Sequence, residues 1–558
     1  MNHRIYLTAA LTSAAITLQA QSLHKEIEVE REIVPVERQA TRINMLPSIE
    51  LPQLTPVKLS LSDRIVTTSV APTFSPLDPV SPASGLLTAD HRGYLRAGIF
   101  PIFNASLQAG YRIVQTDHTR LAAWLDYDGD LYRRGLPDAD LDSKYWRDHS
   151  VKVGAQLSQK IGDKSALDAG IVYGYARHNL WTPNEEDQVS TFNQWHNRLN
   201  LNAMFRSSVE GLKYHAGVRF ERFSYGLKDV NPARQHVYGL DLDGMIEVGQ
   251  DSRFGLGLNA DLLHNSLLDE SDNTGLISLN PRYEYTPEGS FSARVGALVD
   301  ISINDGKAFH IAPDVMAAWR PSSCFGVELQ ATGGVKLNTL SSLYDVTPYI
   351  YSMWSYGRSF VPVDARARVL IGPFSGAYLR IEGGYAKAND WLMPMRNFTL
   401  PGEGAFFSAV DLSAWHAEVE AGWKSSAVEI SAAYATAPSS LTKGYYLWRD
   451  RARHVLSARL AVKPVDKLTV EVGFQLRACR AIYEANYVSS PLDGVEMLVA
   501  ERADLGNATD LSLRADYRLT DTFTVFAQGE NLLNRNYLYL GDRPAQGATG
   551  LVGIILKF

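Results

Sequence analysis

The segment SARLAVKPVDKLTVEVGFQLRA, residues 457–478, decides the fold class because apolar and polar residues alternate on both sides of a short turn. A period of two residues with one apolar face is typical of a β-strand. The turn at Pro464–Lys467 therefore joins two strands. The apolar positions are Ala458, Leu460 and Val462 before the turn, and Leu468, Val470, Val472, Phe474 and Leu476 after it.

The same alternation continues through most of the chain, in runs longer than globular proteins use. HSVKVGAQLSQKIG, residues 149–162, is another example. Such runs reach ten or more residues, whereas strands of globular domains have about five or six. Tight turns alternate with long polar segments, and this arrangement predicts a transmembrane antiparallel β-barrel. The tight turns are 162–165, 207–211, 249–252, 286–290, 320–323, 372–376, 424–427, 462–467 and 519–521, and the long segments are 134–144, 181–192, 226–235, 265–275, 337–361, 388–408, 436–450, 480–507 and 534–548.

Counting strands back from Phe558 predicts an all-β fold with a barrel of about 22 strands, an even number within the known range. The segment 337–361 is either a strand or a folded loop. An even count places both ends of the barrel on one side, which we expect to be the periplasmic side of a Gram-negative outer membrane. Aromatic residues near the expected strand ends suit an interfacial girdle, although a core would suit them equally. They include Trp146, Trp181, Trp195, Trp423 and Trp448.

The N-terminal region differs from the rest of the chain in its residue composition and pattern. Residues 1–20 have a short basic start, an apolar run and small residues before Gln21, which predicts an export signal peptide. Residues 21–91 carry dense charge and then recurrent proline, which blocks helices and central strands, so we expect an extended periplasmic segment. The barrel is expected over residues 92–558. A net charge of −7 gives no reason to expect a nucleic-acid partner.

Within the N-terminal region, KEIEVEREIVPV (residues 25–36) alternates apolar and acidic positions. An extended segment of this kind can add to the edge of a partner's sheet. Candidate partner-binding residues are Glu26, Ile27, Glu28, Val29 and Glu30. A solvated, charged tether is the alternative interpretation.

Two acidic runs flank the loop that leaves the third expected strand. Carboxylates two positions apart share one face of a strand, about 7 Å from one another. These carboxylates are candidate ligands for calcium, which they would hold together with lipopolysaccharide or substrate. Their spacing does not fit an EF-hand. A solvated acidic loop is the alternative interpretation. The residues are Asp126, Asp128 and Asp130 in the first run, and Asp138, Asp140 and Asp142 in the second.

Motifs of known catalytic chemistry are scarce. GLGLNA (residues 255–260) imitates a dinucleotide-binding loop, but it lies inside an alternating strand and no helix follows. HExxH and GxSxG motifs do not occur, and the thirteen histidines are scattered. We therefore expect no enzyme, no cofactor and no histidine metal site. A hydrolase that assembles Ser, His and an acid on the barrel wall remains the alternative.

The end of the chain carries a resemblance to a known family. GENLLNRNY (529–537), a loop, and a glycine-punctuated strand ending in Phe558 look like the C-terminus of TonB-dependent outer-membrane receptors. GPFSGAYLRIEGGYAKANDWLMP (372–394) is similar to plugless relatives from Bacteroidota. The resemblance implies that Phe558 is an assembly signal read by the barrel-assembly machinery. It also implies a TonB contact, to which residues 25–36 correspond only loosely.

The resemblance does not extend to the plug domain of the family, because about 70 proline-broken residues precede the barrel. Two functions stay open: transport or capture of a nutrient, and a structural barrel subunit of an envelope complex recruited through residues 22–91. Expected partners are outer-membrane lipid, the assembly machinery, TonB or another periplasmic protein, and outer-membrane lipoproteins. Cys324 and Cys479 are expected at opposite ends of the barrel and therefore unpaired.

Overall fold

The structure is a computed structural model of the 558-residue chain. It describes residues 91–100, 104–135, 144–183, 189–227, 232–267, 270–349, 357–397, 405–436, 439–441, 452–489, 496–538 and 543–558. The expected signal peptide and the segment 21–90 lie outside this range, and so do Trp448 and the second acidic run. The absence of a plug domain and the domain boundaries before residue 91 therefore stay predictions.

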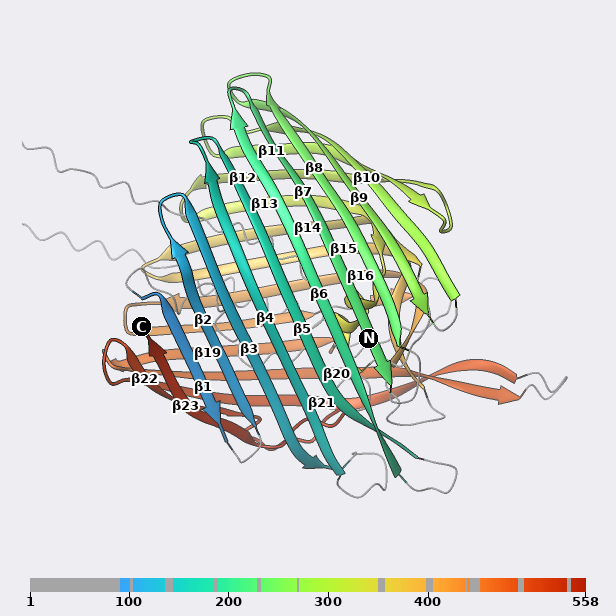
Figure 1. Ribbon diagram of the computed structural model, residues 1–558, viewed down its shortest axis with the longest axis vertical. Coiled ribbons are helices and arrows are strands. Elements are labelled where there is room, and N and C mark those ends of the chain that lie inside the picture. The colour runs from blue at the N-terminus through green and yellow to red at the C-terminus, as the bar shows by residue number, and fades with distance from the viewer. Residues whose placement is uncertain are drawn as a thin grey trace, which may run out of the picture. The chain divides into compact units, whose positions relative to one another are not determined.

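The described residues form one closed antiparallel barrel of 22 strands (Figure 1), which confirms the predicted fold class and count. Counted without the short β18, each strand pairs with its neighbours in the chain, and the first strand pairs with the last. A short piece, β18, pairs with β16 beyond the end of β17. The strands are β1 (Gly93–Ile99), β2 (Ala105–Gln115), β3 (Thr119–Arg134), β4 (Lys144–Ile161), β5 (Ser165–Pro183), β6 (Val189–Val209), β7 (Leu212–Leu227), β8 (Ala233–Glu247), β9 (Ser252–Leu267), β10 (Glu270–Tyr285), β11 (Phe291–Ile303), β12 (Phe309–Ser322), β13 (Phe325–Leu337), β14 (Arg358–Phe374), β15 (Ala377–Asn397), β16 (Ala405–Lys424), β17 (Val428–Thr436), β18 (Ser439–Leu441), β19 (His454–Val465), β20 (Leu468–Ser489), β21 (Glu496–Arg518), β22 (Phe523–Glu530) and β23 (Thr549–Lys557).

The alternation of residue types separates two faces of the barrel wall. Large apolar side chains at every second position are exposed on the outside, where a bilayer would cover them. Charged residues such as Arg219, Asp243 and Asp261 stand at positions between them and face the lumen. On β7, β8 and β9 the exposed apolar set is Leu212, Tyr214, Val218, Tyr238, Leu240, Leu242, Ile246, Phe254, Leu256 and Leu262.

The two ends of the barrel differ as the sequence predicts. One end, called the turn end here, carries the tight turns, including the one between Ile161 and Ser165. The other end, called the loop end, carries the longer connections. The segment 337–361 is a folded loop, because it contains the helix α2 (Leu340–Val346) in place of a strand. No helix among the described residues is long and apolar enough to cross a membrane.

Several expectations at the loop end are wrong. The segment 265–275 is mainly strand, because β9 ends at Leu267 and β10 begins at Glu270. The segment 388–408 is also mainly strand, because β15 ends at Asn397 and β16 begins at Ala405. The segment 480–507 is not mainly a loop, because β20 continues to Ser489 and β21 begins at Glu496, so this hairpin runs out beyond its neighbours (Figure 1). Trp146 is not a girdle residue, because its side chain is buried inside the loop end and its Nε1 donates to the carbonyl oxygen of Arg134 at 2.9 Å. Trp146 has the parity of Lys152 on β4 and not that of Val151 and Val153, so it lies on the polar, lumen-facing side of the strand.

Candidate functional site in the barrel lumen

The lumen wall carries a belt of ion pairs, most of them between neighbouring strands and two of them across one intervening strand. Arginines and carboxylates alternate around it, and several of these side chains are about half exposed, for example Arg219 at 52%. Charges this exposed inside a closed barrel indicate a hydrated interior. The pairs include Arg206–Asp168, Arg198–Glu221, Arg219–Asp261, Arg282–Asp243, Arg294–Asp314, Arg320–Glu328, Arg368–Glu382, Arg380–Glu420 and Arg459–Glu471.

Glycine allows some of these pairs to reach across a whole strand. Arg219 on β7 lies opposite Gly239 on β8, and Gly239 lies opposite Asp261 on β9. A Cβ atom at Gly239 would lie 2.2 Å from Cγ of Arg219, so a larger residue would block the path from Arg219 to Asp261. Gly257, within the GLGLNA run, similarly separates Asp243 from Arg282, whose Nη1 reaches Oδ2 of Asp243 at 2.6 Å. The GLGLNA run is therefore part of a strand, β9, and its Gly257 leaves room for an ion pair between the two neighbouring strands.

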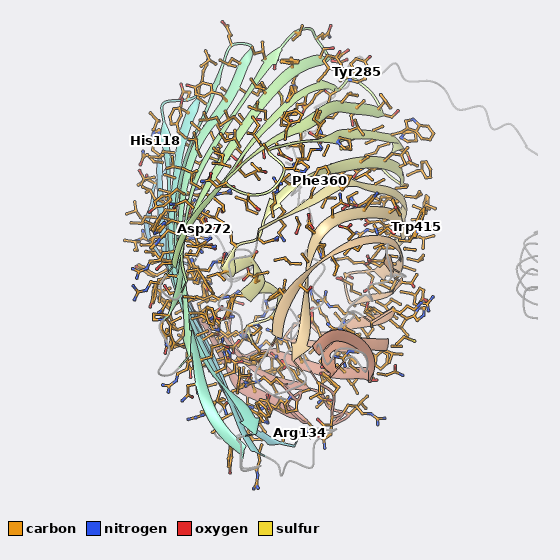
Figure 2. The ribbon with its side chains drawn as sticks, turned by 90° about the vertical axis from the view of Figure 1, so that its right-hand side faces the viewer. His118, Arg134, Asp272, Tyr285, Phe360 and Trp415 are labelled. Carbon is orange, nitrogen blue, oxygen red and sulfur yellow. The ribbon has the colours of Figure 1, made fainter. Side chains whose placement is uncertain are left out.

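The helix α2 lies inside the ring of strands (Figure 2), and one of its sides is anchored to β7 and β8. Thr339 caps its N-terminus by accepting from the N–H of Ser342 at 3.0 Å. Leu340 packs against Phe223 and Tyr225 of β7, and its N–H donates to Oε1 of Gln235 on β8 at 2.9 Å. The start of the helix is thus fixed to one side of the wall.

The other face of α2 contacts a distant part of the wall. Leu343 is buried against Phe407 of β16, and Leu392 of β15 packs beside this pair. The strands β7 and β16 are nine places apart in a ring of 22. The helix therefore bridges nearly opposite walls and narrows the lumen towards its loop end.

The last connection of the barrel, residues 531–548, packs against the wall at the same end. Tyr537 is buried with Ala508 of β21 and Ala545, while the N–H of Ala545 donates to the carbonyl oxygen of Tyr537 at 2.8 Å. Arg480 of β20 donates to the carbonyl oxygen of Leu538 at 2.6 Å. These contacts hold both described arms of the connection to β20 and β21.

Arg543 of this connection is almost fully buried, with only 2% of its surface exposed. Its guanidinium carbon lies 5.5 Å from the ring centroids of Tyr132 and Trp146 and 5.0 Å from that of Tyr349. Its Nε donates to the hydroxyl of Tyr132 at 3.1 Å, and its Nη1 donates to the carbonyl oxygen of Asn179 at 3.3 Å. Cation–π contacts are strongest when water is excluded, as it is around this guanidinium.

Asp148 supplies the countercharge to Arg543. One carboxylate oxygen lies 3.8 Å from Nη2 of Arg543 and accepts from the hydroxyl of Tyr349 at 2.9 Å. Burial opposes the charge of Arg543, yet Tyr132, Tyr349 and Asp148 outweigh it and raise the pKa of the guanidinium above its ordinary value. Burial also raises the pKa of the Tyr349 hydroxyl, so this group stays a hydrogen-bond donor. The two inward-folded connections therefore meet at a fixed cation.

The first predicted acidic run lies on β3 and faces the lumen. Asp128 and Asp130 are exposed there, Asp128 hydrogen-bonds to Ser106, and Asp130 lies directly opposite Asp148 of β4. Among the residues that the structure describes, no group of three His, Cys, Asp or Glu side chains is placed to hold a metal ion. With the second acidic run undescribed, the calcium hypothesis stays a prediction.

The other predicted site residues have separate outcomes. Phe558 is exposed and lies beside Tyr111, with ring centroids 6.2 Å apart. Its role in assembly is a prediction, and so is partner binding by residues 26–30, which lie outside the described part of the chain. Both cysteines are free, as expected.

Sequence reasoning missed Arg543, Tyr349 and the residues of α2. These residues lie in connections between strands, where the sequence shows neither a two-residue alternation nor a run of charges. The only signal was the density of aromatic residues in 337–361, since a solvated loop does not require so many.

Comparisons with known proteins show the fold. No family model matches the chain, and no curated protein matches it in sequence. Among solved structures, the FrpB iron transporter from Neisseria meningitidis has a TM-score of 0.60 and 11% identity, covering 85% of this chain and 82% of its own. A mutant of the ferric enterobactin receptor PfeA from Pseudomonas aeruginosa, in complex with enterobactin, has a TM-score of 0.63, 11% identity and the same coverage. The siderophore receptor PirA from Acinetobacter baumannii has a TM-score of 0.64 and 7% identity, covering 85% and 81%.

Proposed function

We propose that this chain is an outer-membrane, receptor-like barrel that captures a polar nutrient at its loop end and admits it to a hydrated lumen. The fold is that of TonB-dependent receptor barrels, which reside in Gram-negative outer membranes. The observation that carries the proposal is the ion-pair belt below the inward-folded connections, in which Arg206, Arg219 and Arg380 are about half exposed. A wall of this kind suits a water-filled path for a polar solute.

The proposed path is closed at the loop end by α2 and the connection 531–548. Because α2 contacts β7 and β16 through a few buried apolar residues, its position depends on contacts such as Leu343 with Phe407. Local elements with few buried contacts open at lower free energy than the barrel wall does. Capture would thus precede a local opening.

The test is the substitution Leu343→Asp, measured as ion conductance of the purified barrel in a planar bilayer. Burying a carboxylate against Phe407 costs several kcal/mol, so α2 should leave the lumen while the wall stays paired. Conductance should rise well above that of the wild-type barrel. Leu533→Asp is the matched control, because Leu533 is exposed in the connection 531–548. Unchanged conductance of the Leu343→Asp barrel, with heat-modifiability retained, would count against an admitting lumen.

A second candidate function is a structural barrel subunit of an envelope complex, and the bridge that α2 makes across the lumen favours it. A barrel whose opposite walls are linked by a helix in the lumen suits a structural role without solute transport. Purification from the native membrane separates the two candidates. A stoichiometric partner that leaves when residues 22–91 are deleted, combined with a lumen that stays closed in the Leu343→Asp barrel, would support the structural function.

A further inference from the structure

We propose that the pocket around Arg543 is a recognition site for a guanidinium group, which the chain's own Arg543 occupies until a solute carrying that group replaces it. This inference rests on the proposed capture function and names the chemistry of the captured solute. The pocket is defined by Tyr132, Trp146, Asp148 and Tyr349, called the cage here, and it lies at the loop end of the lumen.

The cage is built mainly by the barrel wall. Tyr132 and Trp146 form a directly opposed pair on β3 and β4, and Asp130 and Asp148 form the next inward-facing pair on the same strands. A planar cation between aromatic faces and a carboxylate is the arrangement that guanidinium groups favour. Three of the four cage residues lie on paired strands and therefore stay in place when the occupant leaves.

Hydrogen bonds that do not involve Arg543 hold this part of the wall. Nε1 of Trp146 donates to the carbonyl oxygen of Arg134 at 2.9 Å. Nδ2 of Asn179 donates to the carbonyl oxygen of Tyr145 at 3.0 Å, and its Oδ1 accepts from the N–H of Arg147 at 2.6 Å. The cage is therefore preorganised, which lowers the ordering cost of binding a new ligand.

The opposed carboxylates create a need for a cation at this place. Asp130 and Asp148 carry like charge at directly opposite positions, an arrangement that destabilises a strand pair. Asp128 continues the acidic column down the same face of β3. The column would attract cations from the lumen water towards the cage.

Arg543 fits the cage incompletely. Its Nη2 is buried without a hydrogen-bond partner, and the 3.8 Å to Asp148 is too long for a hydrogen bond. Asp148 is 31% exposed, so solvent reaches its carboxylate while Arg543 is covered. A guanidinium free of the chain could approach Asp148 closely enough for a paired, charge-assisted contact. A free guanidinium would therefore interact more strongly with Asp148 than the side chain of Arg543 does.

The first experiment measures binding of ethylguanidinium, the end of an arginine side chain, to the full-length Arg543→Ala barrel by isothermal titration calorimetry. Binding should be saturable and at least about tenfold tighter than in the Arg543→Ala, Asp148→Asn double variant, because a charged hydrogen-bond partner is worth roughly tenfold or more. Ethylammonium should bind more weakly, since it lacks the planar donor set. Equal binding to both variants would overturn the proposal.

The second experiment uses an intact Arg543 and reports its displacement. In a barrel carrying Cys324→Ser, Cys479→Ser and Ala545→Cys, the new thiol lies at a fully buried position. Agmatine should raise its rate of thiol labelling several-fold, and adding Asp148→Asn should abolish the increase while keeping an acceptor for Tyr349. Unchanged labelling at saturating agmatine would show that Arg543 is only an anchor of the connection. Neither assay requires uptake, so a failure of the transport proposal would leave both results interpretable.

Discussion

Gly93 and Phe558 exchange both of their backbone hydrogen bonds, with N–H to oxygen contacts of 2.7 Å and 3.0 Å. This pair continues the seam between β1 and β23, which closes the barrel. The side chain of Phe558 is 60% exposed on the outer face, so its burial inside the protein does not explain an aromatic residue here. The ring is available to lipid and to the assembly machinery.

Deleting Phe558 should therefore lower the amount of assembled barrel several-fold. The deletion removes one reciprocal backbone pair and the exposed ring at the closing seam. The measurement is the level of heat-modifiable protein in the outer-membrane fraction. Phe558→Trp is the control, because it retains an aromatic ring and the backbone pair. Truncated protein at normal levels with intact heat-modifiability would refute the assembly role.

Deleting residues 25–36 should leave the barrel folded and abolish either solute uptake or partner co-purification. The segment precedes β1, so its removal touches none of the paired strands. Circular dichroism and heat-modifiability check the fold, while affinity purification from the native membrane checks the partner. If uptake and partners both survive the deletion, the segment is a charged tether.

Cys479 should react with a bulky, impermeant thiol reagent on intact cells in preference to Cys324. Cys479 is exposed on β20, level with the start of β19 at the loop end. Cys324 lies in the turn between β12 and β13, where its thiol contacts the carbonyl oxygen of Pro373 at 3.3 Å. The expected orientation places the loop end outside the cell. Preferential labelling of Cys324 would invert that orientation.

Arg219→Glu should make an opened lumen more cation-selective, because it replaces one partner of Asp261 with a second carboxylate. The measurement is the reversal potential across a potassium chloride gradient in the Leu343→Asp background. The Arg219→Asp, Asp261→Arg double variant should restore the original selectivity, as it swaps the charges in place. Exposed ion pairs contribute only about 0.2–1 kcal/mol each, so the fold should survive.

Lys424→Glu is the control for this experiment. It changes the formal charge equally, but Lys424 lies at the turn between β16 and β17 and is 69% exposed. An equal shift of the reversal potential in both variants would mean that Arg219 does not line the conducting path.

The sequence determined the wall of this barrel because a two-residue period ties each residue type to one face of a strand. Segment 457–478 predicted β19, β20 and their turn, and the alternation of short and long connections predicted the strand count. Register followed, since a slip of one residue would turn every apolar side chain into the lumen.

Only the tertiary structure decided what lies inside the wall. No local pattern places α2 across the lumen, because its contacts Phe223 and Phe407 lie on strands far apart in the chain. Arg543 likewise meets Tyr132 over more than 400 residues of separation. The acidic run on β3 was visible in the sequence, but its position beside the Arg543 cage was not. Periodicity reports how a residue faces its own strand, whereas the lumen is filled by contacts between connections and distant strands, which only closure of the barrel brings together.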